Sequence, residues 1–325
     1  MDRKKGIYVA LLSLAVIAVF VILDTVSLPT STFLWAEFHN FGHTPLFGGL
    51  ALALLGLSIL LLSRHLPNRL AHYALAFVIA FMLGVISEAT QILGPRDADL
   101  WDQVRNTAGI VSFLGLWLVH DKRTIESIPW MSRGRLTLIR WAAIGILAVS
   151  VLPTILWADA YIHRYRHFPT LCSFEYYQER MFIRPHQSDV KIVLPPEGWN
   201  ANRTGNAARV TFRPGAVFPG FILSDPYPDW TGYDYLTFDV YSENESTVSI
   251  YMTIEDDRHN REYGDRFNKA LRIEPGANHI GIPLSDIRRA PADREMDMRA
   301  VASINIFGHQ PKAPFSLYFD NFELQ

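Results

Sequence analysis

The chain contains a single cysteine, Cys172, among 325 residues. One cysteine excludes an internal disulfide and any metal cluster that needs several thiolates. A nucleophile elbow, a Walker phosphate-binding loop and a HExxH helix are also missing, so these familiar catalytic motifs do not suggest a reaction. The formal net charge of −2 leaves no excess of basic side chains, and no nucleic-acid partner is expected.

Charged residues are scarce in long stretches of the first half. These apolar runs predict five membrane-spanning helices, at about 6–24, 44–63, 72–93, 102–120 and 137–158. Roughly 20 helical residues cross the hydrocarbon core, and the fourth run reaches that length only with its polar start. The first run follows a basic segment but has no small-residue cleavage site, so a retained helix is expected rather than a signal peptide. Residues 1–160 are therefore expected to form a membrane all-α bundle.

The Lys and Arg residues of the short connections predict the orientation. They gather before the first run, between the second and third runs, and between the fourth and fifth runs. With five helices these three segments share one side, which the positive-inside rule makes cytoplasmic. The other two connections, at 24–43 and 94–103, contain only one Lys or Arg residue, Arg96. The N-terminus is expected in the cytoplasm, and everything after residue 158 is expected on the outer side.

Polar side chains gather at the outward ends of these runs, where hydrocarbon makes them costly unless they serve a function. Glu88 and Gln91 share a helical face with Gly84, whose small size lets a neighbouring helix approach. Asp102 and Asn106 share a face of the next helix in the same way. The predicted polar membrane site comprises His39, His43, Glu88, Gln91, Arg96, Asp99, Asp102 and Asn106.

The residue types leave several roles open for this polar membrane site. Arg96 beside carboxylates and amides suits a phosphate or pyrophosphate headgroup. The two histidines and several carboxylates suit a divalent metal, although the spacing of His39 and His43 fits one only if their segment is helical. The same groups can instead cap helices and stabilise the bundle. Glu88 and His43 are the candidates for an acid and a base if the protein is an enzyme, and no metal is assigned.

Residues 5–125 resemble the VanZ-like membrane proteins. The resemblance is carried by His43 ahead of Phe47 and by the ordered motifs Glu88-x-x-Gln91, Gly94-Pro95-Arg96 and Asp102-x-Val104-x-Asn106-x-x-Gly109. It implies a multi-pass protein of the bacterial cytoplasmic membrane, from a family named for a member linked to antibiotic resistance. The resemblance does not imply a defined reaction. The fifth predicted helix and the long C-terminal part extend beyond the family core.

The second half changes character after the last apolar run. Residues 161–174, which begin with several Tyr, His and Arg side chains, are expected to form an interfacial linker. From about residue 175 short segments alternate between apolar and polar side chains, as at 235–241 and 247–254, and turn residues separate them. This pattern predicts an antiparallel β-sandwich over residues 175–325, in the periplasm or outer wall space.

The order of these segments resembles galactose-binding-like jelly rolls, a sandwich that carbohydrate-binding modules share. The resemblance is carried by the runs at 235–241, 254–257, 265–268, 275–278, 282–287 and 317–322. It favours a glycan ligand, since sugars are bound by aromatic faces and planar polar side chains. The candidate glycan-binding residues are Trp199, Tyr227, Trp230, Tyr233, Asp257, His259, Asn260, Tyr263 and Arg266. Asp320 is a candidate ligand for a structural calcium ion, as in some such sandwiches.

Together these features predict an integral membrane protein of the bacterial envelope with the lipid bilayer around its first half. The leading hypothesis is that the sandwich and the polar membrane site bind a cell-surface polysaccharide or a lipid-linked glycan. One alternative is a membrane enzyme acting on a lipid-linked substrate through Glu88 and His43. Another is a non-catalytic scaffold that binds other proteins of an exopolysaccharide assembly system.

Overall fold

The computed structural model describes residues 3–25, 32–92, 100–199 and 205–325. The chain divides into two compact units, Met1–Ile155 and Leu156–Gln325. The first is helical and the second is dominated by β-strands, so the helical N-terminal part and the antiparallel sandwich that the sequence predicts are both confirmed.

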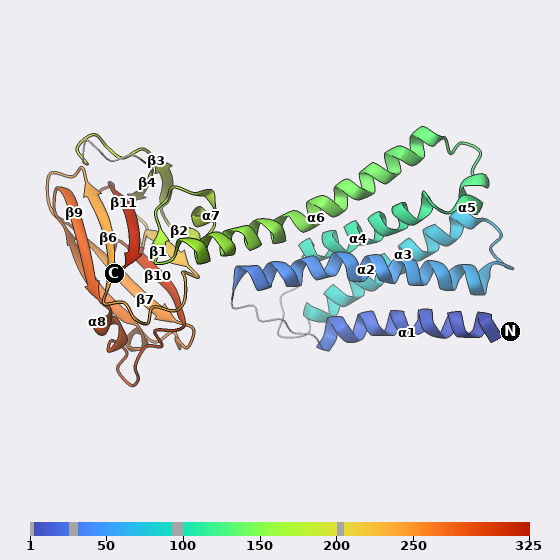
Figure 1. The fold of residues 1–325 in the computed structure, drawn as a ribbon, viewed down its shortest axis with the longest axis horizontal. Helices are drawn as coiled ribbons and strands as arrows, with labels where there is room; N and C mark the ends of the chain where they lie inside the picture. Colours follow the sequence, from blue (N-terminus) through green and yellow to red (C-terminus); the bar gives the residue numbers. More distant parts are fainter. Residues whose placement is uncertain (1–2, 26–31, 93–99, 200–204) are drawn as a thin grey trace. The chain divides into compact units, whose positions relative to one another are not determined.

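The helical elements follow the apolar runs of the sequence (Figure 1). They are α1 (Arg3–Thr25), α2 (Phe33–Leu62), α3 (Arg69–Ile92), α4 (Leu100–Leu118), α5 (Lys122–Glu126) and α6 (Arg133–His167). Among the described residues, three helical segments are long and apolar enough to cross a membrane, namely Phe33–Leu62, Arg69–Ala89 and Arg133–His167. That α1 and α4 also span it, giving five, stays a prediction.

Two helix boundaries differ from those that the sequence predicts. Helix α2 begins at Phe33 rather than near residue 44, because the Thr32 side chain accepts a hydrogen bond from the N–H of Trp35 and caps the helix start. Pro45 lies inside α2 without ending it. Helix α6 continues to His167, so the first half of the predicted linker is helical instead. His39 and His43 therefore lie within a helix.

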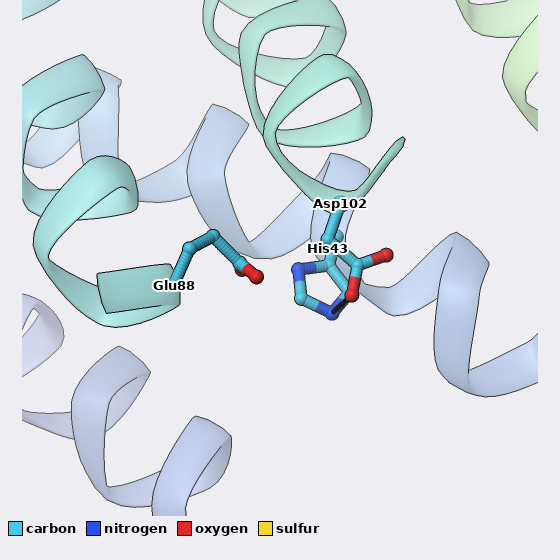
Figure 2. Close-up of side chains that lie close together, drawn as sticks. All are labelled: His43, Glu88 and Asp102. Atoms are coloured by element: carbon cyan, nitrogen blue, oxygen red, sulfur yellow. Dashed lines mark ion pairs between the residues drawn. The ribbon is translucent and has the colours of Figure 1, made fainter. Parts of the chain in front are cut away.

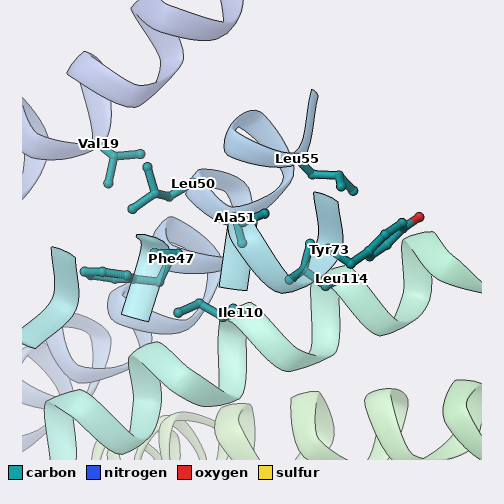
Figure 3. Packing of buried hydrophobic residues seen from close by; sticks show 10 residues of the cluster. Val19, Phe47, Leu50, Ala51, Leu55, Tyr73, Ile110 and Leu114 are labelled. Atoms are coloured by element: carbon teal, nitrogen blue, oxygen red, sulfur yellow. The ribbon is translucent and has the colours of Figure 1, made fainter. Parts of the chain in front are cut away.

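Helix α2 packs against α1, α3 and α4 through buried apolar side chains (Figure 3). The cluster contains Val19, Phe47, Leu50, Ala51, Leu55, Tyr73, Ala76, Ala80, Ile110 and Leu114. The closest approach is at Gly109 of α4, where an added Cβ would lie 2.0 Å from the carbonyl oxygen of Thr44. Only glycine permits this backbone contact, which brings the middle of α4 against α2 at Thr44.

The second unit is a sandwich of two antiparallel sheets. One sheet has the order β3 (Asp189–Val193), β4 (Ala207–Phe212), β11 (Phe315–Leu324), β6 (Tyr235–Ser242) and β9 (Gly276–Pro283), with β1 (Thr170–Cys172) paired to β11. The other has the order β2 (Ile183–His186), β5 (Gly220–Ser224), β10 (Val301–Phe307), β7 (Val248–Asp256) and β8 (Phe267–Ile273). The short helices α7 (Tyr177–Arg180), η1 (Tyr263–Asp265) and α8 (Leu284–Arg288) connect strands.

Side chains along the strands point alternately into the sandwich and outward, and those that point inward form its core. In β7 the side chains of Ile250, Met252 and Ile254 are fully buried, whereas those of Ser249 and Tyr251 are exposed. From the other sheet, the rings of Phe238 and Phe322 stack at 4.7 Å in the interior. The inner faces of the two sheets thus pack against each other, and only the outer faces can offer side chains to a ligand.

Candidate functional site

His43, Glu88 and Asp102 converge inside the helical unit (Figure 2). They come from α2, α3 and α4, and one side-chain nitrogen or oxygen of each lies within 4.8 Å of the others. His43 is 5% exposed and Glu88 is 9% exposed. Within the described residues this is a group of His and acidic side chains close enough to share a cation.

Asn106 determines how the imidazole of His43 faces this group. The Asn106 side chain is fully buried, and its Oδ1 lies 3.0 Å from Nδ1 of His43. The Asn106 amide nitrogen donates to Gln103, which leaves its oxygen toward the histidine. An oxygen can only accept, so Nδ1 carries a proton and donates it. In the neutral imidazole, the lone pair of Nε2 then faces Asp102, whose Oδ2 lies 3.6 Å away.

Arg105 is a member of this cluster that the sequence did not single out. Its guanidinium donates to Oδ1 of Asp102 at 2.5 Å and forms an ion pair one helical turn along α4. The spacing of three from Asp102 is the only signal of this pair in the sequence. Because Arg105 holds Oδ1, the other oxygen of Asp102 is directed to the histidine.

Among the other residues of the predicted polar membrane site, His39 is described and lies outside this group. The ring of His39 lies one turn away, with its centroid 5.7 Å from that of His43. Arg96 and Asp99 lie outside the described residues, as does the side chain of Gln91. A phosphate site built on Arg96 therefore stays a prediction.

The sandwich buries two aromatic rings that the sequence nominates for sugar binding. Trp230 is 1% exposed, and its indole N–H donates to the carbonyl of Tyr227. Trp199 is 3% exposed and stacks on Tyr241 at 5.7 Å. Both rings are buried, Trp199 in a small cluster with Ala207 and Tyr318, so neither presents a face to a ligand in this structure. Tyr227 and Tyr233 are half-buried against the ring of Phe168.

The remaining nominated residues lie in or beside the connection from β7 to β8. Asp257 and Asn260 are exposed there, and Tyr263 is 73% exposed. His259 is folded inward, with its Nδ1 against the carbonyl oxygen of Asp265 at 3.1 Å. This connection runs along one end of the five-stranded sheet, and it leads into Arg266 at the start of β8.

Arg294 fastens the β7–β8 connection. Its guanidinium donates to the carboxylates of both Asp256, at 2.5 and 2.7 Å, and Asp265, at 2.5 and 3.1 Å. The bonds from Arg294 and from the N–H of Asn260 lower the pKa of Asp265 to about 2. Burial by itself raises the pKa of Asp256, but the bonds from Arg294 and the N–H of Asp297 outweigh it and keep that pKa below its usual range.

Arg266 begins a polar row across the outer face of the five-stranded sheet. It donates to Glu255 at 2.9 Å and to Asn268 at 3.1 Å. Strand register places Thr253 between Asn268 and Asn305, and Asn305 donates to the Thr253 hydroxyl at 3.0 Å. The sequence did not reveal this row, because its members come from three strands that pair only in the fold.

Aromatic rings lie beside the polar row on the same outer face. Tyr251 stands directly opposite Phe307 in the strand register, and the two rings stack at 5.8 Å. Phe218 contacts Phe307 edge-on and stacks on His309 at 5.3 Å. Phe218 is 44% exposed and Tyr251 is 37% exposed. We call the polar row and these rings together the β10 face. Its residues are Phe218, Tyr251, Thr253, Glu255, Arg266, Asn268, Asn305, Phe307 and His309.

The outer face of the other sheet carries a hollow of about 470 Å³. Tyr241, Tyr318, Arg209 and Glu243 are among the residues that line it, and the Tyr318 hydroxyl donates to Glu243 at 3.0 Å. It belongs to the opposite side of the sandwich from the β10 face. This separation allows each surface to be altered without touching the other.

Asp320, the candidate calcium ligand, lies in β11 and is buried. One of its carboxylate oxygens accepts a hydrogen bond from the N–H of Asn321 at 2.7 Å. It is not part of the His, Glu and Asp group that shares space for a cation. A calcium role for Asp320 stays a prediction.

The described residues thus define a protein with apolar helices and an antiparallel β-sandwich. No family model matches the chain, so the VanZ-like resemblance stays a prediction. No curated protein matches it either. The C-terminal region resembles the jelly-roll folds of carbohydrate-binding modules among solved structures.

A family 11 carbohydrate-binding module from Clostridium thermocellum, solved with a mixed-linked tetrasaccharide, has 19% identity and a TM-score of 0.35. The match covers 44% of this chain and 88% of that one. A family 30 carbohydrate-binding module has 12% identity and a TM-score of 0.32, covering 44% of this chain and 91% of its own. An exo-beta-agarase has 14% identity and a TM-score of 0.39, covering 48% and 25%. Similarity at such low identities and TM-scores does not identify a ligand for this chain.

Proposed function

We propose that this chain is a membrane-anchored glycan-binding protein whose ligand lies along the β10 face. One observation carries the proposal: two partly exposed aromatic rings and a row of polar side chains, with the buried Thr253 at its middle, occupy the same outer surface of one sheet. A sheet face that only contacts solvent does not need polar side chains that are hydrogen-bonded to one another in a row. The ligand proposed is an envelope polysaccharide or a lipid-linked glycan.

The chemistry of the β10 face suits sugars. A pyranose ring has an apolar C–H surface that packs on an aromatic ring, and hydroxyls around its edge that need donors and acceptors. Tyr251 and Phe307 supply rings, while Arg266, Glu255 and Asn268 supply planar groups. The hydrogen bonds among these planar groups hold them in place before a ligand arrives, which lowers the entropic cost of binding.

The membrane part of the proposal has its own support. Three helical segments among the described residues are long and apolar enough to cross a bilayer. The distribution of Lys and Arg in the connections favours an outward position for everything that follows the last of them. An outward sandwich would meet envelope glycans directly. The bacterial cytoplasmic membrane is the proposed location.

The test is a glycan-binding screen of the purified full chain in detergent, followed by titration of each positive glycan. Binding is expected for at least one envelope polysaccharide. Changing Tyr251→Ala together with Asn305→Ala is expected to weaken it roughly tenfold or more, because a ring contact and hydrogen bonds are lost together. Arg209→Ala on the opposite sheet is the matched control and is expected to leave affinity unchanged.

Three outcomes are informative. A chain that remains folded but binds no glycan would contradict the proposal. A loss caused by Arg209→Ala and not by the β10 face variant would move the ligand to the hollow beside Tyr318. Equal affinity in all variants would show that neither sheet face is the site. Thermal melting of each variant verifies that the sandwich is intact.

A further inference from the structure

We infer that His43, Glu88 and Asp102 form a site for one divalent transition-metal ion of the zinc class. This goes beyond glycan binding, because it concerns the helical unit and a different ligand. The three side chains are contributed by three helices that are distant in sequence, and their ligand atoms converge within 4.8 Å (Figure 2). A nitrogen of an imidazole and oxygens of two carboxylates are all ligands that zinc accepts.

The distance between His43 and Asp102 suits two ligands better than a direct bond. Nε2 lies 3.6 Å from Oδ2, beyond the usual range for an N–H···O hydrogen bond. Zinc bonds to nitrogen and oxygen measure about 2.0–2.2 Å, so two ligands of one tetrahedral ion lie roughly 3.3–3.5 Å apart. The ligand atoms of all three side chains lie within 4.8 Å of one another, and rotation of the flexible Glu88 side chain can bring its carboxylate closer to the other two.

The second contact of His43 is the one that a metal-binding histidine requires. Such a histidine donates its other ring N–H to an oxygen, which selects the tautomer and directs the free nitrogen at the ion. Asn106 takes this place through its Oδ1, 3.0 Å from Nδ1. Asp102 is held likewise, since Arg105 binds one of its oxygens and leaves the other facing the imidazole. Two of the three proposed ligands are thus already oriented.

The charges of the cluster favour a cation. Glu88 and Asp102 bring two negative charges into a site where His43 is almost fully buried, and Arg105 supplies one positive charge. Buried charges are costly unless they are compensated. A divalent ion attracts the carboxylates of both Glu88 and Asp102 and draws them toward the same point. A metal site is therefore a better account of this arrangement than helix capping.

The ligand set also restricts the metal. It contains no thiolate, which disfavours soft monovalent copper, and its imidazole disfavours magnesium and calcium, which take oxygen ligands. The divalent first-row ions from manganese to zinc remain, nickel(II) and copper(II) included. Three protein ligands leave at least one coordination position for water or for an oxygen of a ligand, as in open zinc sites.

The test uses the full chain without a polyhistidine tag, purified in detergent and stripped with a chelator. Titration with Zn²⁺, and separately with Co²⁺ followed by visible absorption, is expected to show one ion per chain. Glu88→Gln, Asp102→Asn and His43→Gln should each weaken binding roughly tenfold or more, because each replaces a carboxylate or imidazole ligand with a neutral amide, which is not among the usual zinc ligands. His72→Gln is the matched control: His72 is also a buried histidine of the helical unit, but it bonds to Ser58 and not to the proposed ligands.

A second measurement keeps the inference testable if a variant fails to fold. X-ray absorption of the unaltered chain loaded with zinc is expected to show one imidazole and oxygen ligands around the ion. A chain that binds no ion would overturn the inference, as would an ion without an imidazole ligand. Unchanged affinity in all three folded ligand variants would do the same, and would assign the cluster to a shared proton or to packing.

Discussion

At the scale of single residues, Arg294 controls the most polar part of the sandwich. It joins Asp256, at the end of β7, to Asp265, just before β8. The connection between these strands borders the β10 face, so its conformation determines where Arg266 begins the polar row. One side chain therefore links the stability of a surface connection to the shape of the proposed glycan site.

The depressed pKa of Asp265 predicts how this link depends on pH. Its folded value is about 2, below the roughly 3.9 of an unfolded aspartate. The charged form is thus favoured by folding: the stabilisation is complete above about pH 4 and is lost as pH falls toward 2. Thermal melting of the full chain between pH 2 and pH 6 should show this loss for the sandwich transition. Arg294→Gln should lower the melting temperature at pH 6 and make it depend less on pH. If the melting temperature of the variant falls below pH 4 as steeply as that of the unaltered chain, the acid sensitivity does not come from the pairing of Asp265 with Arg294.

At the scale of elements, two glycines decide how α2 meets α4. Gly109 has no room for a Cβ against the backbone of Thr44, and Gly48 of α2 faces the ring of Phe113. Small residues at helix crossings let backbones approach, which is common in membrane bundles. The crossing lies next to Asn106 and His43, so the geometry of the polar cluster depends on it.

Gly109→Ala is expected to force these helices apart. An added Cβ would lie 2.0 Å from a backbone oxygen that cannot rotate away, so the loss of stability should be about 2–3 kcal/mol. Melting of the detergent-purified chain measures it, and zinc affinity should fall as well. Gly49→Ala on α2 is the control: nothing lies within 4 Å of its added Cβ, and helix propensity predicts an effect of about 1 kcal/mol or less in the stabilising direction. Equal effects at both positions would contradict the packing argument.

The elements show how far sequence patterns reach. The alternation at 247–254 correctly predicts strand β7, because burial on one face imposes a period of two. The predicted start of the second helix near residue 44 was wrong, because the prediction followed the uncharged apolar run, whereas α2 begins at Phe33 and includes the polar residues before that run. Trp230 illustrates a different limit: its type suggests a sugar platform, but only the fold shows that it is buried. The pairing of Thr253 with Asn305 required strand register, which a single sequence does not contain.

At the scale of the whole molecule, the number of membrane crossings determines the compartment of the sandwich. Three segments meet the length and composition needed for a crossing among the described residues. Whether α1 and α4 also cross decides the count. An odd number places the two ends of the chain on opposite sides, and an even number places them on the same side.

Two reporter fusions can settle whether this count is odd or even, and therefore on which side the sandwich lies. Five crossings predict that a phosphatase active only after export is active when fused after Gln325, and inactive when fused after Ser127, between α5 and α6. Four crossings would precede Ser127, so that point should return to the cytoplasm, in agreement with the Lys and Arg residues around it. A fluorescent protein that matures only in the cytoplasm should give the reverse pattern. If both fusion points report the same side, α6 does not cross as proposed. If Gln325 reports the cytoplasm, the sandwich cannot reach an envelope glycan, and a cytoplasmic ligand must be sought for the β10 face.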